Sequence, residues 1–546
     1  MKKFALFSKY INSKVIWLPP FLFSIIPILA VYVHNINFIG PERIVLPLLY
    51  SFAFTVLSGC VAYTIFKNKE KASVFTSIWV ILFFSFGYIL LILGENKVIA
   101  AIPISLNKLL FGLYAIVLVA IFRFLLKSKS LEKTITLLFL VATTIATLNL
   151  VKIVPFEINR WLDGRKLNQY VSGNLGQITV PNEADLKPDI YYFIFDRYGR
   201  QDVLEKHFDF QNRSHIEFLQ SNGFWVGHES YANYPKTFLS LSSSLNITYL
   251  DFLTPILGDK QGDQVNVYRQ LLQDNQMARF LKSQGYKYVL YGSSWDPLQE
   301  KGIADENYNL LADFDEFHLY VYERTLLNSV RGVIENKQLF TGTERFNKIS
   351  LNLDYRLHRI NRQKDQPQPL FVFGHFLLPH PPYVFSPDCD PYSLSTSSQQ
   401  IPEDGYLNEV QCANNIMKSL ISEIQSRQNR PAVVIFQSDE GPYLPLSYFN
   451  DNGESVPENS ESYFIHSAIL NALYLPNKED PSKPVDYAKM GLSPNLSPLN
   501  TFRTILNYYF GTNLPILENK TYFSLNDDRV YDFKDITDSI NSGNRF

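Results

Sequence analysis

The sequence predicts a membrane-anchored protein with about five N-terminal transmembrane helices and one large outer α/β domain, built on a mostly parallel, doubly wound sheet. Three observations predict this fold class. Long apolar runs are confined to residues 15–154, and lysines gather in alternate loops between those runs. After residue 187, short apolar runs alternate with helical patterns, as they do in sheets that helices cover on both faces.

The composition of the sequence shows where the membrane anchor ends and the outer domain begins. The 546 residues are 46% hydrophobic and carry a formal net charge of -2, so nothing in the charge points to a nucleic-acid partner. The average conceals a segregation, because the residues after 155 read as an ordinary soluble sequence. We therefore expect a transmembrane anchor over 1–155, a juxtamembrane segment and linker over 156–186, and an outer domain over 187–546.

The anchor is predicted from the length of its apolar runs. A helix needs ~20 apolar residues to cross the hydrocarbon core of a bilayer. Three runs have that length and contain no charged residue, and two shorter runs reach it when Arg123 and Lys152 lie at the interface. The five runs are 15–34, 44–66, 72–94, 109–122 and 134–151.

The positions of the lysines predict the orientation, since cytoplasmic loops are enriched in Lys and Arg. With five spans, every lysine-rich segment falls on one side; these are Lys2, Lys3, Lys9 and Lys14, then Lys67, Lys69 and Lys71, then Lys127, Lys129 and Lys133. We expect a multi-pass protein of the plasma or inner membrane, with a cytoplasmic N-terminus and an extracytoplasmic C-terminal domain. No charge lies mid-span, which favours an anchor in the bilayer over a transporter.

The outer domain is predicted from five short apolar runs of the kind expected for strands buried on both faces. They lie at 190–195, 286–294, 369–376, 431–441 and 468–476. Helical patterns lie between and after them, at 268–283, 407–427 and 499–510. This alternation is typical of a doubly wound sheet.

Polar residues follow three of these runs. Asp196 ends the first, His375 and His380 end the third, and Asp439 with Glu440 end the fourth. In such sheets, functional groups gather beyond the carboxyl ends of the strands. A single polar residue after a strand is usually a loop residue or a helix cap, but their joint occurrence favours a common site.

The outer part holds two of the three cysteines, Cys389 and Cys412, while Cys60 lies in an apolar run. In an oxidising compartment this pair could form a disulfide. Two unrelated thiols are an equally good interpretation of the sequence alone.

Five segments resemble the alkaline phosphatase and sulfatase superfamily, and in particular its membrane-bound branch of lipoteichoic acid synthases and phosphoethanolamine transferases. They are PDIYYFIFDRYGR (188–200), NYPKTFLSLSSSLN (233–246), FVFGHFLLPHPPYVF (371–385), VVIFQSDEGP (433–442) and AILNALYLP (468–476). Their order and approximate spacing match that branch, whose members have five N-terminal helices and an outer catalytic domain. The resemblance implies an alkaline-phosphatase-like fold.

The resemblance also implies roles for single residues. Asp196 matches the first metal-binding acid, and Asp439 matches the next one. Thr237 matches a nucleophile that opens a helix and also binds the metal, although a simple helix cap would explain it equally well. His380 matches a histidine that contacts the phosphoryl group or its leaving oxygen, and His375 and Trp295 are candidates for substrate binding.

Two departures from the family pattern bear on the chemistry. Glu440 stands where the family usually has a histidine. If Glu440 binds the metal with Asp196, Thr237 and Asp439, the ligands are all oxygen, and one divalent ion, Mn²⁺ or Mg²⁺ rather than Zn²⁺, is expected. The signature that sulfatases need to make formylglycine is missing around Thr237, so sulfatase activity is not expected.

The function that follows is a metal-dependent phosphoryl-group transferase or hydrolase that acts on phosphoesters of envelope lipids or glycans through a threonine nucleophile. The alternative is a catalytically inert, sulfatase-like relative that serves as a binding or assembly component of the cell envelope. The Glu440 substitution supports this alternative. Metal content distinguishes the two, because an inert relative need not hold a tightly bound ion.

Overall fold

The computed structural model describes most of the chain in two compact units: residues 1–161 with 314–344, and residues 162–313 with 345–546. The described residues are 15–94, 106–175, 178–181, 186–260, 262–293, 295–310, 316–327, 330, 353, 356–357, 359–360, 367–381, 383–392, 404–426, 430–442, 460–524 and 527–543.

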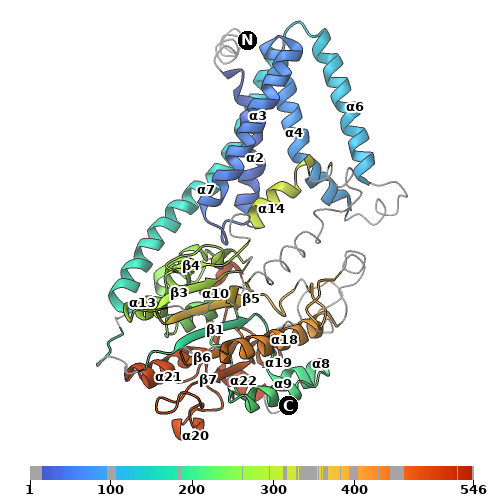
Figure 1. The fold of residues 1–546 in the computed structure, drawn as a ribbon. Helices are drawn as coiled ribbons and strands as arrows, with labels where there is room; N and C mark the ends of the chain where they lie inside the picture. Colours follow the sequence, from blue (N-terminus) through green and yellow to red (C-terminus); the bar gives the residue numbers. More distant parts are fainter. Residues whose placement is uncertain are drawn as a thin grey trace. The chain divides into compact units, whose positions relative to one another are not determined.

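The first unit is a set of apolar helices (Figure 1): α2 (Leu18–His34), α3 (Val45–Phe66), α4 (Lys69–Gly94), α6 (Leu106–Lys127) and the start of α7 (Glu132–Asn174), with a short 3₁₀ turn, η1 (Pro41–Ile44). Among the residues that the structure describes, four helical stretches are long and apolar enough to cross a membrane: Pro41–Phe66, Lys69–Leu93, Leu106–Lys127 and Glu132–Asn174. The helix α2 is also apolar but has only 17 residues. The five predicted apolar helices are therefore present, and the first is the shortest.

Two features of this unit differ from the expectation. Helix α7 does not end near Lys152 but continues through Pro155 to Asn174. The second feature is α14 (Glu316–Glu323), which lies in the range expected for the outer domain but packs against α2. Phe317 is buried there among Ile28, Tyr32 and other apolar residues, which explains why this short segment groups with the apolar helices.

The second unit is built on a seven-stranded sheet with the order β2-β7-β6-β1-β5-β3-β4. The strands are β1 (Asp189–Phe195), β2 (Trp225–Val226), β3 (Lys287–Tyr291), β4 (Glu306–Asn307), β5 (Leu370–Phe376), β6 (Ala432–Gln437) and β7 (Asn471–Tyr474). Strands β4, β3, β5, β1 and β6 pair in parallel, while β7 and β2 add an antiparallel edge. The predicted mostly parallel sheet is thus confirmed.

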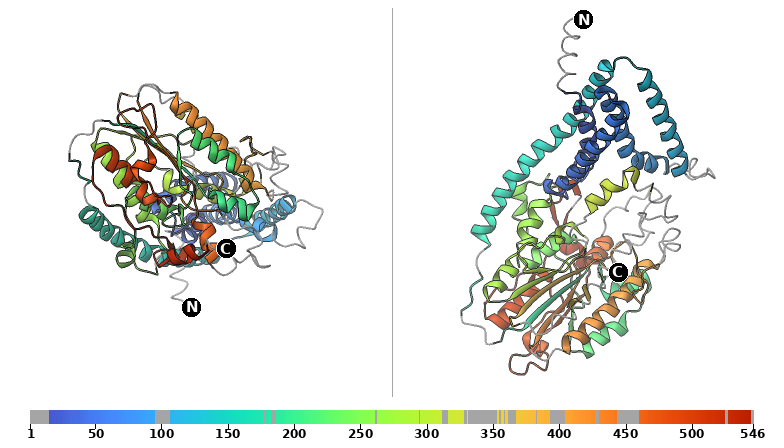
Figure 2. Two further views of the ribbon diagram at one scale, coloured as in Figure 1. Left: turned by 90° about the horizontal axis from the view of Figure 1, so that it is seen from below. Right: turned by 45° about the horizontal axis from the view of Figure 1, so that its top comes forward.

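Alternation along β1 shows why its run is continuously apolar. Tyr191, Phe193 and Phe195 pack on one face of the sheet with residues of α18 (Gly405–Gln425), such as Met417. Ile190, Tyr192 and Ile194 pack on the other face with α21 (Pro498–Phe510) and α10 (Thr237–Leu245). The right-hand view of Figure 2 shows the sheet between the orange α18 and the red α21, so both faces of β1 are buried.

The remaining helices complete this unit. They are α8 (Gln201–Phe208), α9 (Arg213–Ser221), α11 (Leu253–Leu257), α12 (Val265–Val267), α13 (Gln276–Ser283), α19 (Ser460–Ser467), α20 (Tyr487–Met490) and α22 (Thr537–Gly543). Short turns η2 (Tyr268–Gln273), η3 (Asp296–Leu298) and η5 (Asp527–Arg529) and a two-stranded sheet, β8 (Tyr522–Ser524) with β9 (Phe533–Asp535), are also present. The stretch 268–283, expected as one helix, is therefore two elements, η2 and α13.

A disulfide joins Cys389 to Cys412 on α18, with the two Cα atoms 4.9 Å apart. This resolves the two interpretations that the sequence left open in favour of the bridge. A disulfide is stable in an oxidising compartment, which agrees with an extracytoplasmic location for this unit.

Candidate metal centre

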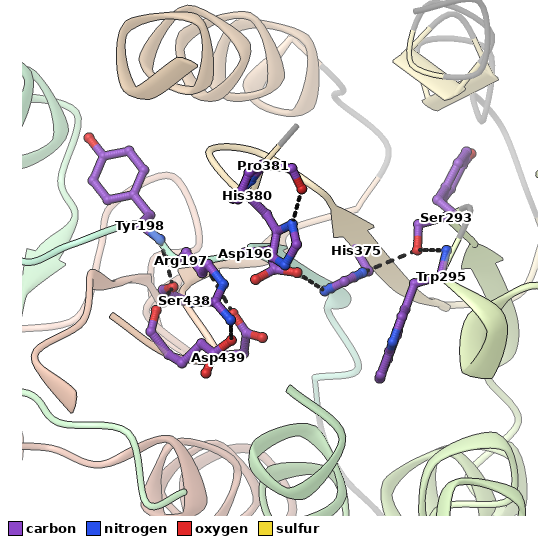
Figure 3. A network of polar contacts seen from close by, with 12 residues as sticks. Asp196, Arg197, Tyr198, Ser293, Trp295, His375, His380, Pro381, Ser438 and Asp439 are labelled. Carbon is purple, nitrogen blue, oxygen red and sulfur yellow. Dashed lines mark hydrogen bonds and ion pairs between the residues drawn. The ribbon is translucent and has the colours of Figure 1, made fainter. Parts of the chain in front are cut away.

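The candidate site lies at the carboxyl ends of three neighbouring parallel strands. Asp196 directly follows β1, His375 is near the end of β5, and Asp439 follows β6. Because β1 is paired with both β5 and β6, these side chains meet at one edge of the sheet. Figure 3 shows Asp196 between His375 on one side and Asp439 on the other.

These three residues form a buried group with the spacing of a metal site. One ligand atom from each of Asp196, His375 and Asp439 lies within 4.8 Å of the others, and all three residues are buried. His375 Nε2 is 3.5 Å from Asp196 Oδ2. Ligand atoms on opposite sides of one ion are separated by roughly 4–5 Å, so a single ion fits among them.

Thr237 joins the group through Asp439. It is the first residue of α10, whose N-cap is Lys236, and its side chain hydrogen-bonds to the Asp439 carboxylate. The hydroxyl thus lies at a helix N-terminus, where free backbone N–H groups favour negative charge. This is a suitable position for a nucleophile or a metal-bound alkoxide.

The charges of the group would be stabilised by a cation. Burial and the negative charge of Glu440 raise the pKa of Asp196, and burial together with Asp196 raises the pKa of Asp439. Two buried carboxylates this close repel one another. In addition, Asp196 Oδ1 and Asp439 Oδ2 are buried without a hydrogen-bond partner among the described residues, and a divalent ion would supply one.

His375 is held as a neutral base. Burial, and then the charges of Arg356 and His380, lower the pKa of His375 to about 3. Its Nδ1 lies 3.2 Å from Ser293 Oγ, at the end of β3, while Nε2 faces Asp196. A neutral imidazole whose second nitrogen is hydrogen-bonded is the usual form of a metal-ligating histidine. The donor set therefore fits a divalent metal.

The loop after Asp196 is fixed by hydrogen bonds. Arg197 has a left-handed backbone, with φ 66°, and its N–H faces Asp439 Oδ1 at 3.4 Å. The hydroxyl of Tyr406 donates to the Arg197 carbonyl at 3.0 Å. The N–H of Tyr198 donates to Ser438 Oγ at 2.9 Å, so the loops after β1 and β6 are joined.

Glu440 lies differently from the expectation. Its carboxylate pairs with the Arg197 guanidinium at 2.8 Å, and among the described residues it is not part of the group with metal-ligand spacing. His375 takes part in that group instead. The all-oxygen set, on which the preference for Mn²⁺ or Mg²⁺ rested, is therefore not the set that the structure brings together, because imidazole nitrogen is added.

The other two sequence candidates border the group. The Trp295 ring lies 5.4 Å from the His375 ring. In Figure 3 the His380 imidazole extends toward Asp196 from the loop after β5. The roles of both residues stay predictions.

Sequence reasoning missed Arg197, Ser293 and Arg356. Buried Arg356 donates to the carbonyls of Tyr291 and His375, at 2.9 and 2.6 Å, and so joins the ends of β3 and β5. Arg197 had a signal, since it directly follows the first acid. Ser293 also follows a strand, but Arg356 had no signal, because it reaches the site from a segment that is not next to any strand end.

One family model matches part of the outer unit. Residues 231–467 match the sulfatase family model, and Thr237, His375, His380, Asp439 and Glu440 all lie inside that match. The chain thus carries a sulfatase-family domain, as the motifs predicted. No curated protein matches the chain.

Three solved structures resemble the chain at low identity. The zinc complex of the C-terminal periplasmic domain of EcEptC from Escherichia coli is 13% identical, with TM-score 0.40, over 65% of this chain and 96% of that one. The soluble domain of lipooligosaccharide phosphoethanolamine transferase A from Neisseria meningitidis is 13% identical, with TM-score 0.38, over 60% and 89%. The integral membrane form of that transferase is 13% identical, with TM-score 0.35, over 90% and 95%. Similarity at this level says nothing about substrate or chemistry.

Proposed function

We propose that this chain, which carries a sulfatase-family domain, is a membrane-anchored, metal-dependent phosphoryl-group transferase or hydrolase with Thr237 as its nucleophile. The observation that carries the proposal is the meeting of a helix-opening threonine with two buried, partnerless carboxylate oxygens at one sheet edge. The apolar helices support a lipid- or glycan-linked phosphoester of the cell envelope as the substrate, since they keep the chain at a membrane.

The residues divide the chemical work among them. Asp196, His375, Asp439 and the Thr237 hydroxyl would hold the metal. When bound, the ion lowers the proton affinity of the hydroxyl and screens the charge of the phosphate. The helix N-terminus of α10 favours both the alkoxide and an incoming phosphate.

The proposed reaction has two steps. Thr237 Oγ forms a bond to phosphorus, the bond from phosphorus to the leaving alcohol breaks, and His380 donates the proton that the leaving oxygen takes up. The threonine hydroxyl gives its proton to the Asp439 carboxylate, with which it is hydrogen-bonded. In the second step, another alcohol or water gives a proton to His380 and attacks the phosphothreonine. The bond from phosphorus to the Thr237 oxygen then breaks, and that oxygen takes back the proton from Asp439.

An inert envelope component is the second candidate, and the pairing of Glu440 with Arg197 favours it. Glu440 stands where the family usually has a histidine, and the charge of its carboxylate is neutralised by Arg197. The inert alternative predicts a purified chain without a stoichiometric metal ion.

The test is a variant of Thr237 in the full-length protein, purified in detergent and loaded with Mn²⁺. Thr237→Ala should abolish hydrolysis of p-nitrophenyl phosphate and the appearance of a phosphorylated threonine by mass spectrometry. Thr237→Ser should keep part of both, because the hydroxyl survives. Thr248→Ala, at a half-buried threonine outside the site, is the matched control. Normal turnover by Thr237→Ala would contradict covalent catalysis by this residue.

A further inference from the structure

Arg197 and Glu440 form an ion pair beside the candidate metal group. Arg197 follows Asp196, and Glu440 follows Asp439, so each partner is next to one of the two buried acids. The guanidinium is 2.8 Å from the carboxylate, and the side chains are only 11% and 6% exposed. A pair this buried is not an ordinary surface salt bridge.

The backbone of Arg197 is held in an unusual conformation. A non-glycine residue with φ 66° is uncommon and costs ~1 kcal/mol or more. The conformation persists because the N–H faces Asp439 and Tyr406 donates to the carbonyl. Both ends of the residue are therefore fixed, and the guanidinium starts from a rigid point at the site.

Arg197 lies next to both acids of the candidate metal group. It directly follows Asp196, and its backbone N–H faces Asp439 Oδ1 at 3.4 Å. The arginine side chain therefore starts beside the two carboxylates between which the metal is proposed to lie.

The charges also need such a cation. Asp196, Asp439 and Glu440 carry three negative charges when ionised. A divalent ion would balance two of them and Arg197 the third. A guanidinium is suited to bind a carboxylate and a phosphate together, because it has five N–H donors in a planar arrangement.

We propose that Arg197 binds the substrate phosphoryl group beside Thr237, and that Glu440 is its positioning residue rather than a metal ligand. This inference rests on the proposed phosphoryl transfer. The position of Glu440 in the sequence suggests a metal ligand, but in this inference Glu440 positions Arg197. The arginine–glutamate pair then binds the substrate, where the family usually has a metal-binding histidine.

The experiment measures binding without turnover. Full-length protein in detergent is loaded with Mn²⁺, its metal content is determined, and its thermal unfolding is followed as inorganic phosphate is added. Arg197→Gln should keep the metal, while the phosphate concentration for half-maximal stabilisation rises ~10-fold or more, as expected for a lost charge-assisted contact. Arg197→Lys should recover part of the affinity. Arg279→Gln, which breaks the exposed pair with Asp274, is the matched control and should change neither quantity.

Glu440→Gln separates the two roles of the glutamate. As a positioning residue it should keep the metal and weaken phosphate binding by a smaller factor, and the double variant should bind phosphate no worse than Arg197→Gln alone. Loss of metal in Glu440→Gln would overturn the inference. So would wild-type phosphate affinity in Arg197→Gln, or the lack of any effect of phosphate on the wild-type protein. None of these outcomes depends on Thr237→Ala, whose normal turnover would instead contradict the proposed nucleophile.

Discussion

Asp196 and Asp439 are two buried carboxylates that repel one another, and the proposed divalent ion would relieve this repulsion. We therefore expect Mn²⁺ to raise the unfolding temperature of the chelator-treated protein. At a Mn²⁺ concentration a hundred times the dissociation constant, the free energy of unfolding should increase by ~3 kcal/mol. Asp439→Asn should remove this response and leave the metal-free protein as stable as before or more so. Asp528→Asn, at an exposed acid, should respond to Mn²⁺ like the wild type. A full Mn²⁺ response in Asp439→Asn would place the ion elsewhere.

His215 gives a pH dependence that is independent of the site. Burial and then the charge of Lys418 lower the pKa of His215 to about 3, and neither ring nitrogen has a hydrogen-bond partner in the part of the chain that the structure describes. The unfolded chain, with an ordinary histidine pKa near 6.5, binds the proton more strongly, so stability falls as the pH falls below 6.5. Between pH 6.5 and 5 the loss should be ~1.5 kcal/mol.

The measurement is the thermal unfolding of His215→Gln and wild type across that range of pH. The variant should show a flatter profile below pH 6.5, whatever its absolute stability. His228→Gln, at an exposed histidine, should keep the wild-type slope. Equal slopes for His215→Gln and wild type would mean that His215 does not titrate with folding.

At the level of residues, the sequence could identify acids at strand ends but not where each side chain points. Asp196 and Asp439 follow apolar runs that were predicted as strands, but the order of these strands in the sheet was not predicted. The choice between His375 and Glu440 could not be made, because it depends on the left-handed turn at Arg197, which carries the guanidinium to Glu440. A non-glycine residue gives no sequence signal for such a turn.

Among the elements, those with long periodic patterns were predictable and the short or tertiary ones were not. The strands β1, β5 and β6 and the helix α18 follow from apolar runs and a 3.6-residue period. The antiparallel direction of β7 has no local signal, since direction is set by pairing with β6. The helix α14 has too few residues for its apolar face to reveal that it packs against other apolar helices.

The close contact between the end of α14 and α4 gives a prediction about Gly87 on α4. A Cβ added at Gly87 would lie 2.3 Å from the Glu323 carbonyl oxygen and 2.5 Å from Arg324 Cα, and the Gly87 N–H donates to the Arg324 carbonyl at 3.0 Å. Gly87→Ala should therefore push the end of α14 away and destabilise the protein by roughly 1–3 kcal/mol, although alanine favours helix.

The matched control is Gly112→Ala on α6, where a Cβ would meet nothing within 4 Å. Helix propensity alone predicts that both substitutions are neutral or stabilising. Thermal unfolding in detergent, with the rate of trypsin cleavage after Arg324, distinguishes the two cases. Faster cleavage only in Gly87→Ala is expected. Equal unfolding temperatures and cleavage rates in the two variants would show that the close approach of Gly87 to residues 323–324 does not contribute to stability.

For the whole molecule, the segregation of apolar and soluble sequence was enough to predict two parts. It could not show that α14 returns to the helical unit, because that return depends on packing. The orientation in the membrane stays a prediction from the lysines. The disulfide supports it, since Cys389 and Cys412 would stay reduced on the cytoplasmic side.

Labelling of single cysteines on intact cells tests that orientation. In a Cys60→Ser background, a membrane-impermeant maleimide should label Asn96→Cys and Lys260→Cys, because both are predicted to lie outside. Lys69→Cys should be labelled only after the membrane is permeabilised, because its loop is one of the lysine-rich segments that the positive-inside rule retains in the cytoplasm. Permeabilised cells provide the control that each cysteine can react. Labelling of Lys69→Cys from outside would contradict the predicted topology. The candidate site would then lie in the cytoplasm, where it could not meet substrates in the cell envelope.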